Sequence, residues 1–378
     1  MSIELKNLYD DFRDAKTIKA YAKQIAIDAK KLGRPIGIME VCGGHTHTIM
    51  KYGLPQLMPA NVHFIHGPGC PVCIMPKERV DHAYTLAMQP DVILVTLGDM
   101  IRVPGSHGSL QDARAKGADV RFVYSPIDVL KIARENPDKK VIFFAIGFET
   151  TTPMTAALLE SVIKNDIKNV LFYINHVTVP EVMTTLMIDG ENRPVENKID
   201  AFLGPSHVSV IAGSQIYEPF ASVYKRPVVV SGFEPVDVMQ SIHMILKQLI
   251  EGRSEVEVQY ARAVEKGGNK KAQELTNKYF EKAPLFSWRG LGKVPKSSWQ
   301  LKDEFSAYDA QKIYDSILSK EECQDHKLCR CGDILKGLAT PPDCTIFGTL
   351  CKPSNPVGSC MVSSEGACSA YYKYGNIK

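Results

Sequence analysis

The chain has 378 residues, of which 44% are hydrophobic and 23% are charged, a balance typical of globular proteins. At about 150 residues per domain, this length predicts two or three domains and excludes intrinsic disorder. The net charge of +3 is too small for the strong basic field of a nucleic-acid-binding protein. The longest strongly apolar run, 141–148, is too short to span a bilayer. The charged N-terminus has no secretory signal pattern, so we expect a cytoplasmic protein with neither nucleic-acid nor membrane partners.

Residues 3–32 have the apolar spacing of an amphipathic helix, which we expect to end at the breaker Gly33-Arg34-Pro35. Two sets of short apolar segments follow, and helical stretches separate them. The first set of expected strands is Ile36–Val41, Val62–Ile65, Val92–Thr96 and Arg121–Tyr124. The second set is Val141–Ile146, Val170–Ile174, Ala201–Leu203 and Val228–Val230. Strands that alternate with helices predict an α/β fold with parallel sheets.

The two sets of strands match in order and in the residues that follow them. GIMEVCGGHTHT in the first set corresponds to VIFFAIGFETTT in the second, and NVHFIHGPGCP corresponds to NVLFYINHVTVP. Asn61 and Asn169 are 108 positions apart, and Asp128 and Asp237 are 109 apart. A nearly constant offset predicts a duplicated α/β unit. We therefore expect an N-terminal helical region, two similar parallel-sheet α/β domains and a helical, Cys-rich C-terminal domain, at residues 1–33, 34–135, 136–250 and 251–378.

Reactive side chains follow the expected strands, at the edge where open parallel sheets bind ligands. Cys42-Gly-Gly-His45 follows the first strand, and Cys70-Pro-Val-Cys73 follows the second. Three thiols and an imidazole suit Zn(II) or Fe(II), and the Cys70–Cys73 spacing is also that of thioredoxin-type redox pairs. We expect the N-terminus of the following helix to lower the pKa of the Cys42 thiol. Glu149 is a weaker candidate, because a helix cap also explains it. The full set of weaker candidates is His47, His66, Asp99, His107, Glu149, His176 and His207.

The ten cysteines are unevenly placed, with none between residues 74 and 322. In a reducing cytosol, crowded cysteines are more typical of metal or redox sites than of structural disulfides. The tail lacks the paired C-x2-C knuckles of zinc ribbons, and its irregular spacing with Pro and Gly fits a [4Fe–4S] cluster. We expect Cys329 and Cys360 to form a redox pair and four other thiolates to hold the cluster, namely Cys331, Cys344, Cys351 and Cys368. Spacing alone leaves this partition open, and Cys323 has no assigned role.

Five separated motifs resemble those of a known family. They are CGGHTH (42–47), GPGCPVC (67–73), GFETT (147–151), GPSHVS (204–209) and the tail pattern CRCG…CTIFGTLCKP…PVGSCMVSSEGAC. Together they resemble the HypD family of [NiFe]-hydrogenase maturation factors over nearly the whole chain. No motif position departs from the family pattern.

The resemblance implies two α/β domains of like topology and an iron–sulfur domain. It also implies a complex with the small chaperone HypC, on which the Fe(CN)2CO group is assembled with cyanide from HypE and passed to the hydrogenase large-subunit precursor. Cys42 would then bind the Fe(II) that carries CN and CO, with His45 beside it and Cys70 and Cys73 as an adjacent thiol pair. The tail cysteines would hold the [4Fe–4S] cluster. The chain would be an assembly scaffold with redox and cyanation chemistry.

Two other functions are open on the residues alone. An iron–sulfur thiol–disulfide oxidoreductase resembling ferredoxin–thioredoxin reductase would use Cys70 and Cys73 to reduce a protein disulfide directly. That function leaves Cys42-Gly-Gly-His45 unexplained. A non-catalytic zinc-bound interaction module is the third alternative, and metal analysis would identify it.

Overall fold

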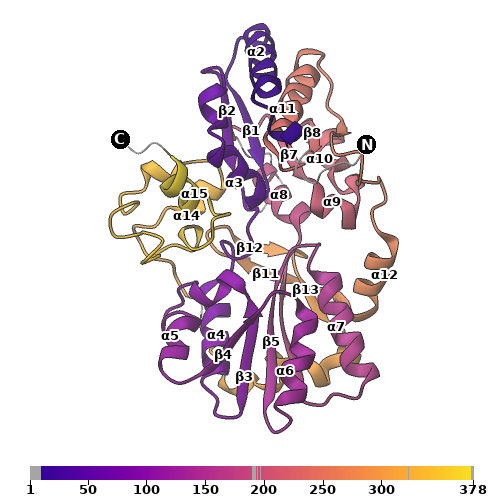
Figure 1. Cartoon of the computed structure of the whole chain (residues 1–378), viewed down its shortest axis with the longest axis vertical. Helices are drawn as coiled ribbons and strands as arrows, with labels where there is room; N and C mark the ends of the chain where they lie inside the picture. The colour runs from indigo at the N-terminus through magenta and orange to yellow at the C-terminus, as the bar shows by residue number, and fades with distance from the viewer. Residues whose placement is uncertain (1–9, 190–192, 194, 196, 322, 376–378) are drawn as a thin grey trace.

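The computed structural model describes residues 10–189, 193, 195, 197–321 and 323–375. Two parallel sheets form the body of the molecule, one above the other in Figure 1. Sheet A has the strand order β2-β1-β7-β8-β9, and sheet B has the order β4-β3-β5-β6. Every strand pair within these two sheets is parallel. The α/β class predicted from alternating strands and helices is confirmed.

The eight expected strands correspond to β1 to β8. Sheet A contains β1 (Ile36–Glu40), β2 (Val62–His66), β7 (Ala201–Pro205), β8 (Val228–Ser231) and β9 (Val256–Val258). Sheet B contains β3 (Val92–Leu97), β4 (Asp119–Val123), β5 (Lys140–Gly147) and β6 (Val170–His176). The strands β1, β7 and β8 of sheet A and β3, β5 and β6 of sheet B are buried on both faces, which explains their continuous apolar runs.

Helices connect the strands and cover the sheets. Those in the α/β body are α2 (Ala15–Leu32), α3 (Gly43–Lys51), α4 (Lys77–Ala87), α5 (Leu110–Ala115), α6 (Val129–Glu135), α7 (Thr152–Lys164), α8 (Val179–Met187), α9 (Ser206–Ala212), α10 (Glu218–Ser222) and α11 (Pro235–Ile250). The helix expected at residues 3–32 begins only at Ala15, because the Asp14 side chain caps it by accepting a hydrogen bond from the Thr17 N–H. Residues 1–9 lie outside the described part of the chain. Among the described helices, none is both long and apolar enough to span a bilayer.

The duplicated halves are interleaved in space. The first half contributes β1 and β2 to sheet A and β3 and β4 to sheet B, whereas the second half contributes β5 and β6 to sheet B and β7 and β8 to sheet A. The halves join where β1 pairs with β7 and where β3 pairs with β5. Residues 34–135 and 136–250 therefore do not each form a sheet of their own. In the repeat, β1, β2, β3 and β4 correspond to β5, β6, β7 and β8. When each strand in the order β2-β1-β7-β8 of sheet A is replaced by its counterpart, the result is β6-β5-β3-β4, which is the order of sheet B counted from its other edge.

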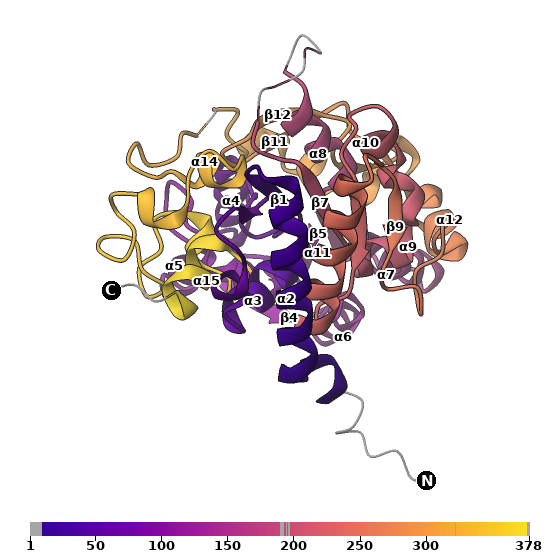
Figure 2. The same cartoon turned by 90° about the horizontal axis from the view of Figure 1, so that it is seen from above.

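Three apolar clusters hold the layers together. Helices α2 and α11 pack side by side on sheet A (Figure 2). The apolar cluster at this face includes the buried residues Ile25, Ile38 and Leu246. Helices α6 and α7 cover one face of sheet B, where Phe143 is fully buried. The largest cluster extends over both sheets and includes residues of the Cys-rich tail. The tail is therefore ordered partly by packing against the α/β body.

The C-terminal region has only short elements, as its Gly, Pro and Cys content predicts. After α12 (Lys270–Tyr279), the chain forms two antiparallel two-stranded sheets, β10 with β13 and β11 with β12. Their bounds are β10 (Phe280–Lys282), β11 (Leu285–Trp288), β12 (Gly292–Pro295) and β13 (Trp299–Leu301). The remaining helices are α13 (Ala310–Ile313), α14 (Cys331–Leu335) and α15 (Ala367–Tyr374). Helix α15 packs against α3, so the tail lies beside the first strand-end loop (Figure 1).

We expect the Phe143→Ala variant to lower the free energy of unfolding by about 3–5 kcal/mol, because it leaves a cavity in the core of sheet B. Urea unfolding measures this difference. The matched control is Phe122→Ala, since Phe122 is 45% exposed and its loss costs about 1 kcal/mol or less. Equal losses in the two variants would contradict this account of the core.

Candidate functional site

The loops after β1 and β2 meet at Cys42. Cys42 caps the N-terminus of α3, where its sulfur accepts a hydrogen bond from the Gly44 N–H at 3.4 Å. A Cβ on Gly69 would come within 2.2 Å of the Cys42 backbone nitrogen, so only glycine allows this approach. The Gly43 N–H also donates to the Gly69 carbonyl at 3.1 Å. The motifs CGGHTH and GPGCPVC therefore form one site.

The Glu40 side chain interacts with residues on both sides of this contact. It is the last residue of β1 and is fully buried. Its Oε2 accepts a hydrogen bond from the Cys42 N–H at 3.0 Å, and its Oε1 lies 2.7 Å from Nδ1 of His66 and also accepts from the Thr46 hydroxyl. Burial raises the pKa of the Glu40 carboxyl, although these partners oppose the rise. Glu40 was not predicted as a site residue; the available signal was an acidic residue in an otherwise apolar strand.

Two imidazoles pack against the Phe233 ring, and one of them, His207, lies close to the Cys42 sulfur. The ring nitrogens of His207 lie 3.9 and 4.0 Å from the Cys42 sulfur. Nε2 of His45 lies 3.0 Å from the Gly232 carbonyl oxygen. The Phe233 ring packs against both imidazoles, with centroid distances of 4.6 Å to His45 and 5.1 Å to His207. Phe233 was not predicted as a site residue, because only the fold brings the loop after β8 to the loop after β1.

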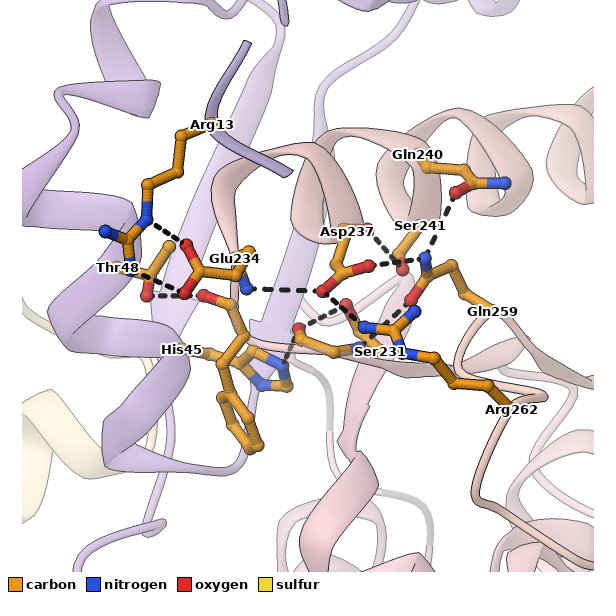
Figure 3. Close-up of polar contacts among 12 residues, drawn as sticks. Arg13, His45, Thr48, Ser231, Glu234, Asp237, Gln240, Ser241, Gln259 and Arg262 are labelled. Atoms are coloured by element: carbon orange, nitrogen blue, oxygen red, sulfur yellow. Dashed lines mark hydrogen bonds and ion pairs between the residues drawn. The ribbon is translucent and has the colours of Figure 1, made fainter. Parts of the chain in front are cut away.

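Figure 3 shows how the loop that positions His45 is itself held. The buried Asp237 accepts hydrogen bonds from the Glu234 N–H and from Nε2 of Gln259. The Gln259 side chain in turn accepts from the Gly232 N–H at 3.0 Å. Arg13 forms an ion pair with Glu234 at 2.6 Å. This network fixes the Gly232 carbonyl that faces the imidazole.

Burial determines the charge state of the site. It lowers the pKa of both His45 and His207 to about 4, so both imidazoles are neutral at neutral pH. Burial also raises the pKa of Cys42, with further contributions from the nearby Glu365 and Glu40. The expectation that the helix N-terminus lowers the pKa of this thiol is therefore wrong. The N–H groups of α3 do stabilise the thiolate, but removal of water outweighs them.

The dithiol loop connects this site to the tail. Cys70 and Cys73 are buried, and their thiols contact each other. The Cys73 thiol also contacts the Cys360 thiol, and the Ser359 hydroxyl donates to the Cys73 carbonyl. The structure thus brings an early cysteine and a tail cysteine together although 286 residues separate their loops.

Three other tail thiols contact the thiol of Cys331. Its sulfur is 3.3 Å from that of Cys329, and it contacts the thiols of Cys360 and Cys368. The two other expected ligands are also buried, but their sulfurs lie near backbone groups. These are Cys344, 3.6 Å from the Leu328 oxygen, and Cys351, 3.4 Å from the Val357 nitrogen. Cys323 lies apart from this group, 3.3 Å from Asp81.

The tail is compatible with an iron–sulfur centre. All ten cysteines are free thiols, and six of the seven in the tail lie within one region. A Cβ on Gly358 would come within 2.6 Å of the Cys331 sulfur and 2.7 Å of the Cys329 sulfur, so this glycine leaves room between the thiols. Among the described residues, no group of three or more Cys, His, Asp or Glu side chains is arranged to hold a single metal ion. An iron–sulfur cluster differs from such a site because its thiolates bind separate irons.

The remaining predicted side chains have partners away from Cys42. The ring of His47 packs against Tyr374, and His107 packs near Tyr84. Asp99 forms an ion pair with Arg102, and Nε2 of His176 lies 2.8 Å from the Thr155 hydroxyl. These contacts are structural and bring none of the four side chains to the thiol.

Comparisons with known proteins agree on one family. The family model HypD, described as "Hydrogenase formation hypA family", matches residues 16–375. The chain is 50% identical to the hydrogenase maturation factor HypD of Azotobacter vinelandii over 367 residues, which cover 97% of this chain and 96% of that protein. It is 48% identical to HypD of Rhizobium leguminosarum bv. viciae, with 98% and 96% covered. It is 44% identical to HypD of Escherichia coli K12, with 97% of each chain covered.

We expect the Gly69→Ala variant to lower the free energy of unfolding by about 1–3 kcal/mol, because the added methyl group collides with the Cys42 backbone. Urea unfolding measures this loss, and the rate of Cys42 alkylation, followed by mass spectrometry, reports the opening of the loops. The control is Gly267→Ala, whose methyl group meets only the flexible Lys270 side chain at 3.3 Å. Unchanged stability and alkylation in Gly69→Ala would show that the loops do not depend on this contact.

Proposed function

The chain belongs to the HypD family of hydrogenase maturation factors, and we propose that it is the scaffold on which the Fe(CN)2CO group of [NiFe]-hydrogenase is assembled. It works with HypC in the cytoplasm, accepts cyanide from HypE and delivers the finished group to the hydrogenase large-subunit precursor. The observation that supports this proposal is the backbone contact between the Cys42 loop and the loop that carries Cys70 and Cys73, which joins a buried thiol and a dithiol loop in one site.

Cys42 is the thiol that binds the iron of the cargo. Fe(II) with cyanide and carbonyl ligands requires a soft, electron-rich anchor such as a thiolate. Burial makes the free Cys42 thiolate unfavourable, and a bound cation offsets this cost. The neutral imidazoles of His45 and His207 add no positive charge beside the metal and exclude water from the thiolate. His45 is oriented by the Gly232 carbonyl.

Cys70 and Cys73 supply electrons for cyanide transfer. Release of cyanide from a thiocyanate consumes two electrons and one proton: R–S–C≡N + 2 e⁻ + H⁺ → R–SH + CN⁻. Oxidation of the two thiols to a disulfide provides both electrons. The contact between the Cys73 and Cys360 thiols offers a route by which exchange with a tail dithiol restores the reduced pair. When bound, a [4Fe–4S] cluster supplies electrons one at a time.

The thiol contacts favour one partition of the tail cysteines. A redox pair that includes Cys360 needs a second thiol in contact with it, and the tail thiol there is Cys331. We therefore propose Cys331 and Cys360 as the pair, which leaves four cysteines to hold the [4Fe–4S] cluster, namely Cys329, Cys344, Cys351 and Cys368. Relative to the partition suggested by spacing, Cys329 and Cys331 exchange roles.

A direct thiol–disulfide oxidoreductase is the second candidate, and the contact between Cys73 and Cys360 also favours it. It differs from the scaffold in one respect, because it gives Cys42 and its two imidazoles no role. Reduction of a protein disulfide by the chain alone, at the same rate in a Cys42→Ala variant, would support this second function.

In the Cys42→Ala variant, isolated anaerobically with HypC, we expect loss of the cargo iron and of its infrared cyanide and carbonyl bands. The iron–sulfur absorbance should remain, because the tail thiols are unchanged. Cys323→Ala is the matched control, since Cys323 lies apart from both sites, and it should keep both signals. Loss of the cargo iron and the iron–sulfur absorbance together in Cys42→Ala would contradict the assignment of two separate sites.

The partition of the tail thiols is tested by Cys329→Ser and Cys331→Ser. We expect Cys329→Ser to lose most of the iron–sulfur absorbance and the corresponding iron and sulfide. Cys331→Ser should keep the cluster but lose the disulfide with Cys360, which thiol counting after mild oxidation measures. The opposite pair of results would support the partition derived from spacing.

A further inference from the structure

A cavity of about 760 Å³ lies beside the edge strand β2 and has no role in the function proposed so far. Part of its wall is β2 itself, and another part is the tail segment 337–341, between Cys331 and Cys344. In Figure 1, the tail lies on the same side of sheet A as β2. A cavity of this size suits a short peptide segment or a small molecule. We call it the β2 groove.

The backbone of β2 is free along one edge. β2 is the outermost strand of sheet A and pairs only with β1. The Ile36 N–H donates to the Asn61 carbonyl at 2.7 Å, so the odd-numbered residues of this segment turn their backbone groups toward β1. Because backbone groups alternate in direction along a strand, the N–H and C=O groups of Phe64 and His66 face away from β1. No other strand in the described part of the chain pairs with them.

The β2 groove follows this free edge. Its lining includes His63 and Ile65 from one face of the strand and Phe64 and His66 from the other face. Since β1 covers the other edge of β2, a cavity that touches both faces runs along the free edge. An extended segment placed there can form main-chain hydrogen bonds with Phe64 and His66, as in other cases of strand addition. The open backbone groups therefore favour a peptide over a compact small molecule.

Two polar groups that line the β2 groove have no hydrogen-bond or ion-pair partner in the part of the chain that the structure describes. They are the Lys198 ammonium group and the Tyr371 hydroxyl. A side chain on Gly37 would collide with the Lys198 carbonyl, and Gly37 pairs with His63, so Lys198 lies at the start of β2. The Tyr371 ring packs against His66 with a centroid distance of 5.4 Å, at the end of β2.

The charges around the groove favour an acidic segment. The Asp200 carboxylate also lines the groove, but it forms an ion pair with Arg34 at 2.6 Å. Asp343 accepts hydrogen bonds from the N–H and the hydroxyl of Thr340. An acidic residue on a bound segment can therefore pair with the exposed Lys198. The sequence of β2, VHFIH, has no acidic residue, so a second copy of this strand does not offer that partner.

Hydrogen bonds connect the β2 groove with the Cys42 site. Nδ1 of His66 lies 2.7 Å from Oε1 of Glu40, and Oε2 of Glu40 accepts from the Cys42 N–H at 3.0 Å. Nε2 of His66 is buried and has no partner among the described residues. A segment in the groove therefore lies against the residue that holds Glu40 in place.

We propose that the β2 groove binds an extended, acidic segment of a partner protein, which adds to sheet A as a strand beside β2. Apolar residues of the segment pack on Ile65 and on Leu338, which is 60% exposed, and its acidic residue pairs with Lys198. The inference goes beyond the proposed function, which assigns no docking surface to this edge of the sheet. Its basis is the juxtaposition of a free strand edge, a cavity along that edge and an ammonium group at its start.

The probe is the fluorescein-labelled peptide VTVSVE with an amidated C-terminus. It alternates apolar and polar residues, as an added strand requires, and in an antiparallel arrangement its last residue meets Lys198. The peptide is titrated into the full chain, and fluorescence anisotropy follows binding. We expect saturable binding, and a wild-type chain that does not bind the peptide would overturn the inference.

Hydrogen exchange, measured by NMR, locates the bound peptide. Exchange of the Phe64 and His66 amides should slow in the complex, because these N–H groups become donors to the peptide backbone. The Ile65 amide is the internal control, since it faces β1 and should exchange as before. Binding without protection of Phe64 and His66 would show that the peptide does not add to β2.

Two N-methylated forms of the peptide test the backbone contact itself. One form carries the methyl groups on the alternate residues whose N–H groups face β2, and the other carries them on the residues between. The first should bind about tenfold more weakly, because it loses main-chain hydrogen bonds, and the second should bind like the unmodified peptide. Equal binding of the two forms would rule out strand addition.

Variants of the chain test the cavity and its charge. Ala339→Trp places a large ring in the groove and should abolish binding. Lys198→Glu should weaken binding about fivefold, the effect of one surface charge pair, and the peptide VTVSVK should restore it. Lys271→Glu is the matched control, since it makes the same change on α12 and leaves the groove intact. Equal binding of VTVSVE by wild type and Lys198→Glu would contradict the charge assignment.

Sedimentation of the chain alone tests the other occupant of the groove. A dimer that Ala339→Trp dissociates would assign the groove to a second copy of the chain and overturn the inference. These measurements need neither HypC nor HypE, so their outcome is independent of the proposed role in hydrogenase maturation.

Discussion

The site depends on one buried carboxyl group, that of Glu40. Taking this group out of water is costly unless hydrogen bonds replace those that water made. Its partners are the Cys42 N–H, the Thr46 hydroxyl and the His66 ring, and they belong to two segments, the N-terminus of α3 and the end of β2. Both segments therefore form hydrogen bonds with the same buried carboxyl group, which holds them together. Together with Gly69, which allows the two backbones to touch, this constraint sets the thiol of Cys42 beside the dithiol loop.

The exchange of strands between the two halves explains why one site can draw on loops far apart in the chain. Sheet A receives β1 and β2 from the first half and β7 and β8 from the second. Cys42 follows β1, His207 follows β7 and Phe233 follows β8, so all three reach the same edge of sheet A. A gene duplication with separate sheets would have left these side chains in different domains. The interleaved arrangement makes the two halves a single structural unit.

Features that depend on local sequence were predictable, and those that depend on pairing were not. Apolar segments predicted β1 to β8, and the repeat predicted which strands correspond. The exchange of strands between the two sheets could not be predicted, because β1 and β5 have similar apolar patterns and no local sequence signal selects β7 as the partner of β1. The contact of Cys73 with Cys360 is equally non-local. The raised pKa of Cys42 was missed because the helix N-terminus can be read from the sequence, whereas complete burial cannot.

Specific polar contacts attach the cysteine-rich tail to the α/β body. The Arg289 N–H donates to the Ile74 carbonyl at 2.8 Å, and its side chain forms an ion pair with Asp325 at 2.6 Å, four residues before Cys329. A buried guanidinium is tolerated only when it is paired, so this residue ties the dithiol loop to the cysteine-rich segment. Two interactions hold the Cys73 and Cys360 thiols in contact. One is the attachment of Arg289 to the dithiol loop, and the other is the hydrogen bond from the Ser359 hydroxyl to the Cys73 carbonyl. The proposed electron supply and the proposed cargo site therefore belong to one folding unit, because the same loop carries the dithiol, receives the tail and touches Cys42.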